Sequence, residues 1–288
     1  MDLVCERPAS DLAHADSFVP RFGGATANVA VTAARRGARV ALAGGAGDDA
    51  WGRWLRARLE AERVDLRWFG LVPGAPTPVA FVTADEDGEP RYEIYGESIE
   101  AVLEPLAARL DEAVEASEAL FFGSNTLVGA REREITMAAR ERALALERPV
   151  IFDANLRLDR WRTHVDAAAS ANACVPGALL VRCNAAEARV MTGEPDPERA
   201  AGSLVKAGAR MAVITLGQRG AILRGELRAD ALGEPVHVLS TSGAGDAFTA
   251  VLLARLAQTR FYPAAVAAGL AEAVGEAARA CERWSAVG

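Results

Sequence analysis

The stretch STSGAGDAFTAVLLARLA, residues 240–257, places two glycines and an alanine before a single acid and then continues as an apolar segment. Small residues allow successive backbone N–H groups to point into one concavity, and at a helix start these donors add to the positive end of the helix dipole. The stretch therefore predicts an anion-binding turn at the N-terminus of a helix. Asp246 has two interpretations there: a favourable helix-start acid, or a general base beside the bound anion.

On both sides of this stretch, short apolar runs alternate with longer segments of helical period. Expected strands include ALFFGS (119–124), PVIFDANLR (149–157), GALLVRCN (177–184) and MAVITLG (211–217). Such alternation predicts an α/β fold with a mostly parallel sheet and helices on both faces. Ligands bind such sheets at the edge where the carboxyl ends of the strands meet. Segments 76–96 and 221–232 break the alternation and predict hairpins, because each pairs two short strands across turn residues.

The composition excludes several classes of protein. The chain has 288 residues, 51% hydrophobic residues and a net charge of −7, with no basic run, so we expect no nucleic-acid partner. The 4 cysteines form no C-x-x-C pair and the 3 histidines are scattered, which argues against a zinc site. We find no signal-peptide pattern and no apolar run long enough to span a membrane. We therefore expect a cytoplasmic protein with no membrane partner.

Glycine-bearing turns at 22–28, 43–52 and 215–220 join the one at 240–248 on the expected ligand-binding edge. None contains G-K-[ST], which excludes a P-loop nucleotidase. The turn at 43–52 carries Asp48 and Asp49 in much the same setting as Asp246. Spacing alone does not choose between these acids.

STSGAGDAF resembles the D-T-x-G-A-G-D signature of the ribokinase-like, or PfkB, carbohydrate kinases. FGGATANVAVTAARRGARVALAGGAGDDAWG, NAAEARVMTG and ITLGQRGAIL resemble further family segments and occur in family order across the chain. FDANLRLDRW resembles fructokinases and 2-keto-3-deoxygluconate kinases. The resemblance implies a ribokinase-like three-layer sandwich, a mostly parallel sheet with helices on both faces and a small β lid. It also implies an ATP-dependent sugar kinase whose acceptor is a fructose-like ketose or 2-keto-3-deoxygluconate.

The resemblance assigns roles on the acceptor side of the reaction. It makes Asp246 the catalytic base, and Gly243, Ala244 and Gly245 the anion hole for the γ-phosphoryl group. The residues implied to bind substrate are Asp2, Gly23, Gly24, Asn28 and Arg157. Fructokinase-like members often carry an Arg where this chain has Gly96 and Glu97, and Arg91 is our candidate substitute.

On the nucleotide side, the resemblance assigns Thr215, Gly217 and Gly220 to a nucleotide-binding loop, together with the glycines of the anion hole. It assigns Asn184 and Glu187 to nucleotide and Mg²⁺ binding, through water. Without the resemblance, these two residues are an ordinary helix cap and a first-turn acid. Trp161 is expected to pack in the core.

The chain departs from the family at two further places. Ser240 stands where the signature has Asp, an acid that often helps to build a monovalent-cation site, which puts potassium activation in doubt. Met1 directly precedes Asp2, where the family has a buried first strand, so we expect that core strand to be missing and the true start to lie upstream. We otherwise expect a single domain over 1–288, with a lid formed by about 6–22 and 76–98, and a homodimer by analogy with relatives.

Two other functions stay open. A non-catalytic sugar- or nucleotide-binding protein on the same fold would also carry these glycine turns, and Ser240 and the expected missing strand would then be signs of decay. A nucleoside kinase shares the same G-A-G-D core but fits FDANLRLDRW poorly. A turnover assay over a panel of acceptors separates all three.

Overall fold

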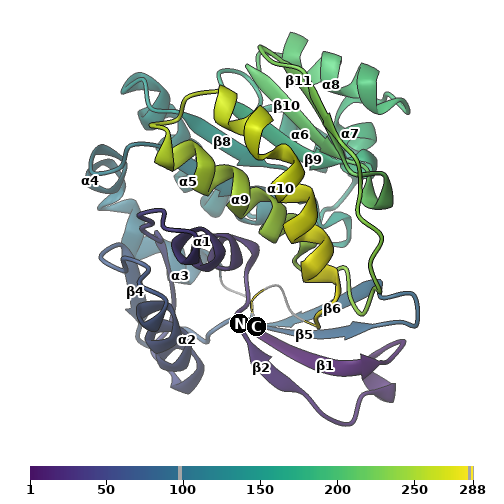
Figure 1. Ribbon diagram of the computed structural model, residues 1–288. Coiled ribbons are helices and arrows are strands. Elements are labelled where there is room, and N and C mark those ends of the chain that lie inside the picture. Colours follow the sequence, from purple (N-terminus) through teal and green to yellow (C-terminus); the bar gives the residue numbers. More distant parts are fainter. Residues whose placement is uncertain (97–98, 285–286, 288) are drawn as a thin grey trace. The chain divides into compact units, whose positions relative to one another are not determined.

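The computed structural model describes residues 1–96, 99–284 and 287, and the chain divides into two units (Figure 1). Unit 1 consists of Met1–Leu106, Pro235–Gln258 and Gly275–Gly288. Unit 2 consists of Ala107–Glu234 and Thr259–Val274.

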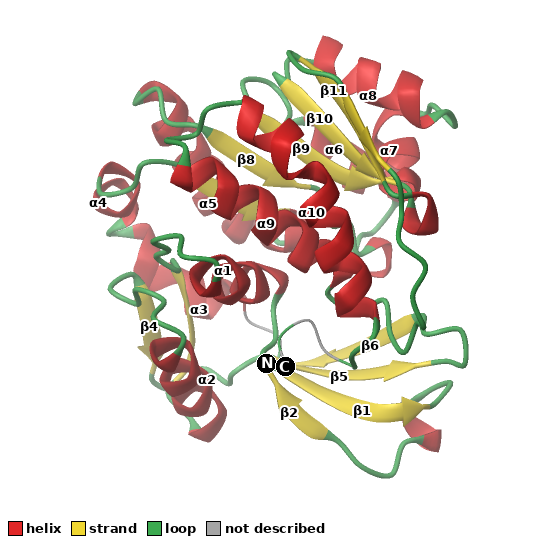
Figure 2. Ribbon diagram, in the orientation of Figure 1, coloured by secondary structure: helices red, strands yellow, loops and turns green. Residues whose placement is uncertain are grey.

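Unit 2 is built on a six-stranded sheet with the strand order β12-β11-β10-β9-β8-β7 (Figure 2). Its strands are β7 (Leu120–Gly123), β8 (Val150–Asp153), β9 (Leu180–Asn184), β10 (Met211–Thr215), β11 (Ala221–Gly225) and β12 (Ala229–Ala231). Strands β7 to β10 pair in parallel, and β11 and β12 add an antiparallel hairpin. The expected parallel strands and the hairpin at 221–232 are confirmed.

Helix α4 (Leu110–Glu115) precedes β7. The parallel strands of unit 2 are connected by α5 (Ala130–Ala145), α6 (His164–Asn172), α7 (Ala185–Thr192) and α8 (Pro197–Lys206). Helix α5 contacts β7 and β8, α7 contacts β9 and β10, and α8 contacts β10 and β11. Helix α8 begins sharply because the Asp196 carboxylate accepts hydrogen bonds from the first-turn amides of Glu198 and Arg199, while Pro197 fixes the first helical position.

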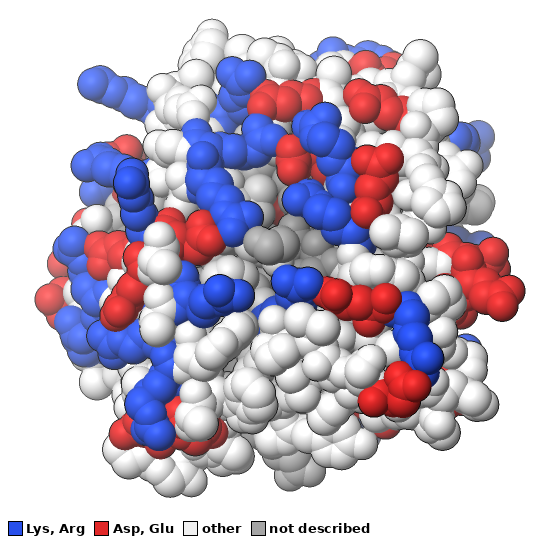
Figure 3. Space-filling model, turned by 60° about the horizontal axis from the view of Figure 1, so that its bottom comes forward, with Lys and Arg blue, Asp and Glu red and all other residues white. Residues whose placement is uncertain are grey.

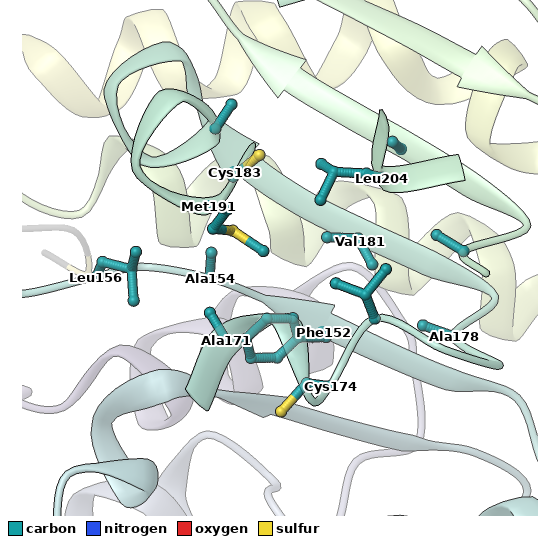
Figure 4. Close-up of a cluster of buried hydrophobic side chains, with 14 of the residues drawn as sticks. Phe152, Ala154, Leu156, Ala171, Cys174, Ala178, Val181, Cys183, Met191 and Leu204 are labelled. Atoms are coloured by element: carbon teal, nitrogen blue, oxygen red, sulfur yellow. The ribbon is translucent and has the colours of Figure 1, made fainter. Parts of the chain in front are cut away.

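The core of unit 2 forms where these helices cover the sheet (Figure 4). Phe152 of β8, Val181 of β9 and Leu204 of α8 are almost completely buried in it. Burial of side chains of this size contributes about 1.5–3 kcal/mol each. The packing fixes the strands, and therefore fixes the edge at which their carboxyl ends lie.

Unit 1 contains a four-stranded sheet with the order β2-β1-β5-β6. Its strands are β1 (Asp2–Pro8), β2 (Val19–Arg21), β5 (Val79–Ala84) and β6 (Pro90–Tyr95). Strands β1 and β5 are parallel, and the other pairs are antiparallel. The hairpin expected over 76–96 is confirmed as β5 and β6. The sheet begins at Asp2 rather than near residue 6, and residues 97 and 98 of the expected lid lie outside the described residues.

The rest of unit 1 contains a parallel pair of short strands and several helices. These elements are β3 (Gly44–Gly47), β4 (Phe69–Val72), α1 (Ala25–Arg35), α2 (Ala50–Ala61), α3 (Ile99–Ala107), α9 (Ala244–Gln258) and α10 (Ala264–Cys281), whose first part belongs to unit 2. Helices α1 and α9 pack against each other. Strand β3 begins at Gly44, and Ala41 forms an isolated bridge to Asp65 before it.

Basic and acidic side chains are interspersed over the face shown in Figure 3. Many arginines pair with carboxylates, among them Arg35 with Glu62 and Arg210 with Glu226. Exposed pairs of this kind contribute about 0–1 kcal/mol each to stability. Within the described part of the chain, no helix combines the length and apolar character that crossing a bilayer requires.

Candidate active site

Asp246 lies in the first turn of α9, and its side chain is buried. The helix starts directly after Gly243, whose φ of 76° is a conformation that glycine adopts without strain. The Ala244 amide donates to the carbonyl of Thr241 at 3.3 Å and closes the turn. First-turn amides lack intrahelical partners, so the glycine turn places N–H donors and the positive end of the helix dipole beside the acid.

Asn28 is joined to Asp246 by a hydrogen bond. The side-chain amide Nδ2 of Asn28 donates to Asp246 Oδ2 at 2.9 Å, and both side chains are buried. A carboxylate accepts only, so this bond fixes which end of the Asn28 amide faces it. Asn28 Oδ1 is buried and accepts no hydrogen bond from any described residue. A buried acceptor left in that state costs about 1–3 kcal/mol, so this atom is suited to a donor from a ligand.

The glycine pair lies directly against Asp2. A Cβ atom placed on Gly23 would collide with the backbone of Met1 and with Asp2 Oδ1, whereas one on Gly24 would meet open space. Gly24 is instead required by its backbone: it caps α1 with a φ of 89°. Unit 1 contains all the expected acceptor-side residues described so far: Asp2, the glycine pair, Asn28 and Asp246.

The turn before α9 is tied to the β5–β6 hairpin. The Tyr92 hydroxyl lies 2.7 Å from the hydroxyl of Ser242, and the Thr241 amide donates to the carbonyl of Gly88 at 2.8 Å. Ser240 Oγ accepts from the Ser242 amide at 3.1 Å. Sequence reasoning did not single out Tyr92 of β6, which lies in register with the buried Val82 of β5 and therefore faces the same side of the sheet.

Arg91 and Tyr92 project from opposite faces of β6, because successive side chains of a strand alternate. Tyr92 is on the face that reaches Ser242, and Arg91 is exposed on the other. The expectation that Arg91 contacts the substrate stays a prediction.

The carboxyl ends of the parallel strands of unit 2 meet at one edge of its sheet. Asn184, the last residue of β9, lies in register with Thr215, the last residue of β10. Arg182 Nη1 donates to the Asp153 carboxylate at 3.1 Å, and its Nη2 donates to the Thr215 hydroxyl at 3.0 Å. The expected nucleotide-side residues Asn184 and Thr215 are therefore brought together, and Arg182, which sequence reasoning missed, joins three strand ends.

Asn184 and Glu187 form a reciprocal cap at the start of α7. Asn184 Oδ1 accepts from the Glu187 amide at 2.9 Å, and Glu187 Oε2 accepts from the Asn184 amide at 2.7 Å. Glu187 Oε1 also accepts from the amide of Leu156 at 2.9 Å. Burial raises the pKa of the Glu187 carboxyl above its usual range, although the nearby Arg182 guanidinium acts in the opposite direction.

The same two residues were expected to hold Mg²⁺ through water. Among the described residues there is no cluster of three or more His, Cys, Asp or Glu side chains able to hold a metal. Backbone amides already occupy both residues, but each carboxylate oxygen of Glu187 retains a second lone pair. The donor set therefore fits a hydrated ion held through water, and does not form a closed metal cage.

Gly217 and Gly220 shape the loop between β10 and β11. Their φ values are 60° and 93°, and the Leu216 amide donates to the Gly220 carbonyl at 2.7 Å. A Cβ on Gly220 would collide with the carbonyl of Ala231, whereas one on Gly217 would meet open space. The loop follows Thr215 directly, so Thr215, Gly217 and Gly220 all lie on one short segment at the end of β10.

Arg157 and Trp161 flank a short 3₁₀ helix at Leu158–Arg160 after β8. Trp161 is buried in the core of unit 2, which confirms its expected packing role. Arg157 is half-buried. The preceding Asn155 has a φ of 33°, and its carbonyl accepts from the Ser124 hydroxyl at 3.1 Å, which holds the loop in that conformation.

Asp48 and Asp49 have structural roles in unit 1. Asp49 caps α2 by accepting from the Gly52 amide at 2.8 Å, and it also accepts from the Thr77 amide at 2.8 Å and the Thr77 hydroxyl at 2.7 Å. Asp48 pairs with the exposed Arg53. Of the acids that spacing left open, Asp246 is the one whose carboxylate meets a buried amide with an orphaned acceptor.

Known proteins resemble the chain over nearly its whole length. It is 30% identical over 270 residues to probable fructokinase-4 of Arabidopsis thaliana, covering 90% of this chain and 80% of the relative. The fructokinase of Vibrio cholerae O395 bound to fructose, ADP and calcium is 28% identical with a TM-score of 0.82, covering 97% of this chain and 89% of that one.

A third likeness is to the aminoimidazole riboside kinase of Salmonella enterica in complex with aminoimidazole riboside and an ATP analog. It is 25% identical with a TM-score of 0.82, covering 99% of this chain and 91% of that one. These likenesses confirm the ribokinase-like α/β fold expected from the sequence. The family model for the pfkB family carbohydrate kinases matches residues 1–282. The chain therefore belongs to the pfkB family of carbohydrate kinases and is a phosphotransferase that acts on a sugar hydroxyl.

Proposed function

We propose that this ATP-dependent sugar kinase phosphorylates a hydroxyl of a fructose-like ketose or of 2-keto-3-deoxygluconate, with Asp246 as the general base. The observation that carries the proposal is the arrangement at the start of α9. There a buried carboxylate lies beside helix-terminal amides and beside Asn28, whose Oδ1 still lacks a donor. A base, an anion cradle and an acceptor for a ligand hydroxyl are the groups that phosphoryl transfer to an alcohol needs.

In the proposed reaction, Asp246 accepts the proton of the sugar hydroxyl. The oxygen of that hydroxyl forms a bond to the γ-phosphorus of ATP. The bond between that phosphorus and the β–γ bridging oxygen breaks, and ADP leaves. Amides of the Gly243–Gly245 turn stabilise the charge on the phosphoryl oxygens. Asn28 Oδ1 accepts from a hydroxyl of the sugar, and Asp2, held against Gly23, accepts from others.

For the nucleotide, we propose residues at and just after the carboxyl ends of β9 and β10: Asn184, Thr215, Gly217 and Gly220. Asn184 and Glu187 would hold hydrated Mg²⁺ through water. When bound, the ion supplies positive charge against the phosphate oxygens. Arg157, half-buried in the loop after β8, is proposed to face the substrate or the transferred phosphate.

We propose that the four-stranded sheet of unit 1 acts as the lid that excludes water from the sugar. The sheet itself carries Asp2, in β1, and its hairpin is bonded to the turn before α9 through Tyr92 and Gly88. Excluding water limits wasteful hydrolysis of ATP.

The Ser240 hydroxyl supplies a second feature of the proposal. It accepts from the Ser242 amide and so holds the turn without the acid that the family signature carries there. We therefore propose that turnover needs no monovalent cation. Equal rates in potassium and tetramethylammonium buffers are the expected result, and activation by potassium would contradict it.

The choice of sugar rests on two observations. FDANLRLDRW fits the fructokinase and 2-keto-3-deoxygluconate kinase pattern, and a fructokinase is among the similar solved structures. A riboside is the second candidate, because the Salmonella enterica protein that this chain resembles was solved with aminoimidazole riboside.

The test is an assay of ADP release with Mg-ATP against fructose, 2-keto-3-deoxygluconate, ribose, tagatose, adenosine, inosine and aminoimidazole riboside. Asp246→Asn is expected to lower kcat by about 10²–10⁴-fold, the usual contribution of a general base. Asp166→Asn is the matched control, because Asp166 is an exposed first-turn acid of another helix, α6. Binding of ATP without turnover on any acceptor would instead support a sugar- or nucleotide-binding protein.

A further inference from the structure

We propose that Asn28 is a positioning residue for Asp246, and that its two amide atoms have separate duties. Nδ2 holds and orients the catalytic carboxylate, while Oδ1 serves the ligand. The inference rests on the proposed function of Asp246 as the base, and it adds a link between that base and the recognition of the acceptor.

The link is carried by a hydrogen bond between two buried side chains. Asn28 Nδ2 donates to Asp246 Oδ2 at 2.9 Å, and both side chains are more than nine-tenths buried. A donor fixed on one carboxylate oxygen restricts rotation of the group and so sets the direction in which its oxygens face.

The backbone on both sides of the bond is held firmly. Asn28 lies in the first turn of α1, where its own amide donates to the Gly24 carbonyl at 3.1 Å, and Val29 and Val31 of the same helix are almost completely buried. Asp246 lies in the first turn of α9, which packs against α1. The bond therefore joins two rigid helix ends rather than two mobile loops.

The other half of the amide points to the ligand. Asn28 Oδ1 is a buried acceptor without a donor among the residues that the structure describes. A hydroxyl that bonds to it would be fixed relative to the carboxylate through one planar amide group. One side chain would thereby align the acceptor and the base together.

Two substitutions separate these duties. Asn28→Asp keeps an acceptor oxygen for the ligand but replaces the donor with a second carboxyl facing Asp246. The two carboxyls then share a proton that occupies the base. We expect kcat to fall by about 10²-fold or more while KM for the sugar changes by less than about threefold. Asn28→Ala removes both atoms, so kcat should fall and KM should rise.

A third variant keeps the test decisive if Asn28→Asp folds poorly. The exchange Asn28→Asp with Asp246→Asn restores an amide–carboxylate pair with the partners reversed. Its melting temperature should recover toward the wild-type value, while activity stays lost because the carboxylate stands at the wrong position. The control is Asn172→Asp, which changes an exposed amide that donates to the Met191 carbonyl in unit 2, and it should leave kcat and KM unaltered.

The outcomes distinguish this inference from the proposed function. Sugar-dependent turnover in the wild type, lost in Asp246→Asn, supports the function by itself. If that result holds but Asn28→Asp raises KM and leaves kcat intact, Asn28 serves the ligand alone and the inference is wrong. If the exchanged double variant melts no higher than Asn28→Asp, the pairing is not what joins the two positions. If the wild type shows no turnover, both proposals fail.

Discussion

Arg182 and Asp153 form a buried ion pair at the carboxyl ends of β9 and β8, with Arg182 Nη1 3.1 Å from the Asp153 carboxylate. Their side chains are only 8% and 3% exposed. Arg182 also donates to the Thr215 hydroxyl on β10. Three neighbouring strands are thus tied together at the edge that carries Asn184 and Thr215.

Removing the charge of Arg182 should destabilise the protein strongly. Arg182→Met removes the guanidinium that pairs with the buried Asp153 carboxylate, and breaking a buried pair in this way costs about 3–5 kcal/mol. The measurement is the free energy of unfolding from urea titrations. Arg210→Met is the matched control, because the Arg210–Glu226 pair is exposed and should contribute at most about 1 kcal/mol. If both variants lose the same free energy of unfolding, the buried pair contributes no more to stability than the exposed pair.

Tyr92→Phe should weaken catalysis while leaving the fold largely intact. The variant removes the hydroxyl that bonds to Ser242 in the turn before the catalytic helix. A hydrogen bond contributes about 0.5–1.5 kcal/mol, so kcat/KM should fall by about twofold to tenfold. Tyr95→Phe is the control on the same strand, since Tyr95 is exposed and its hydroxyl donates to Glu93 at 3.4 Å. Identical kinetics for both variants would show that the bond between Tyr92 and Ser242 does not contribute to catalysis.

Gly220→Ala should destabilise unit 2. The residue has a φ of 93°, and a Cβ would collide with the carbonyl of Ala231, which is backbone and has little freedom to move. Strain at such a position costs about 1–3 kcal/mol. Gly202→Ala should change stability in the opposite direction. Gly202 lies in the middle of α8 on its exposed face, and a Cβ there would have no atom within 4 Å. There alanine should stabilise by about 0.5–1 kcal/mol. Thermal or urea unfolding of both variants decides the prediction.

Asp49 should make stability depend on pH in the acid range. Burial alone would raise the pKa of its carboxyl, but hydrogen bonds from Gly52 and Thr77 outweigh burial and hold the pKa below its ordinary value of 3.8. The ionised form is therefore favoured in the folded protein. Its contribution is complete above the unfolded pKa and is lost as the pH falls through the lower, folded pKa.

The check compares the free energy of unfolding of the wild type with that of Asp49→Asn. The difference should be constant between about pH 7 and 5 and should shrink below about pH 4. Asp48→Asn is the neighbouring control, because Asp48 pairs with an exposed arginine and caps no helix. If the difference in the free energy of unfolding grows as the pH falls, the pKa of Asp49 is raised in the folded protein and the prediction is wrong.

Local patterns in the sequence predicted the elements with regular periodicity. The parallel strands of unit 2 are apolar runs flanked by turn residues, and the segment after Asp246 has the length and period of a helix, so both could be recognised. Strand β3 could not, because Gly44–Gly47 reads as a turn. Glycine is required there for close approach: a Cβ on Gly45 would collide with the Val102 carbonyl, and one on Gly47 with the Ala75 carbonyl.

The candidate site was predictable as a set of motifs but not as a set of contacts. The motifs pointed to Asn28 and Asp246 separately, and only the packing of α1 on α9 shows that one donates to the other. Arg91 was chosen for its charge, and strand register places it on the opposite face from Tyr92. Tyr92 and Arg182 were missed because neither has a local signature, and each acts through a partner distant in sequence.

The strand order of unit 2 has a consequence for how that sheet is made. From β7 to β12, neighbours in the sheet are also successive strands in the chain. Each new strand pairs with the strand made just before it, so each new pairing closes only the loop just completed. On a ribosome that releases about 5–20 residues per second, there is time for each strand to dock before the next one emerges. The sheet can therefore grow in the direction of translation, with a single open edge advancing until the β11–β12 hairpin covers it.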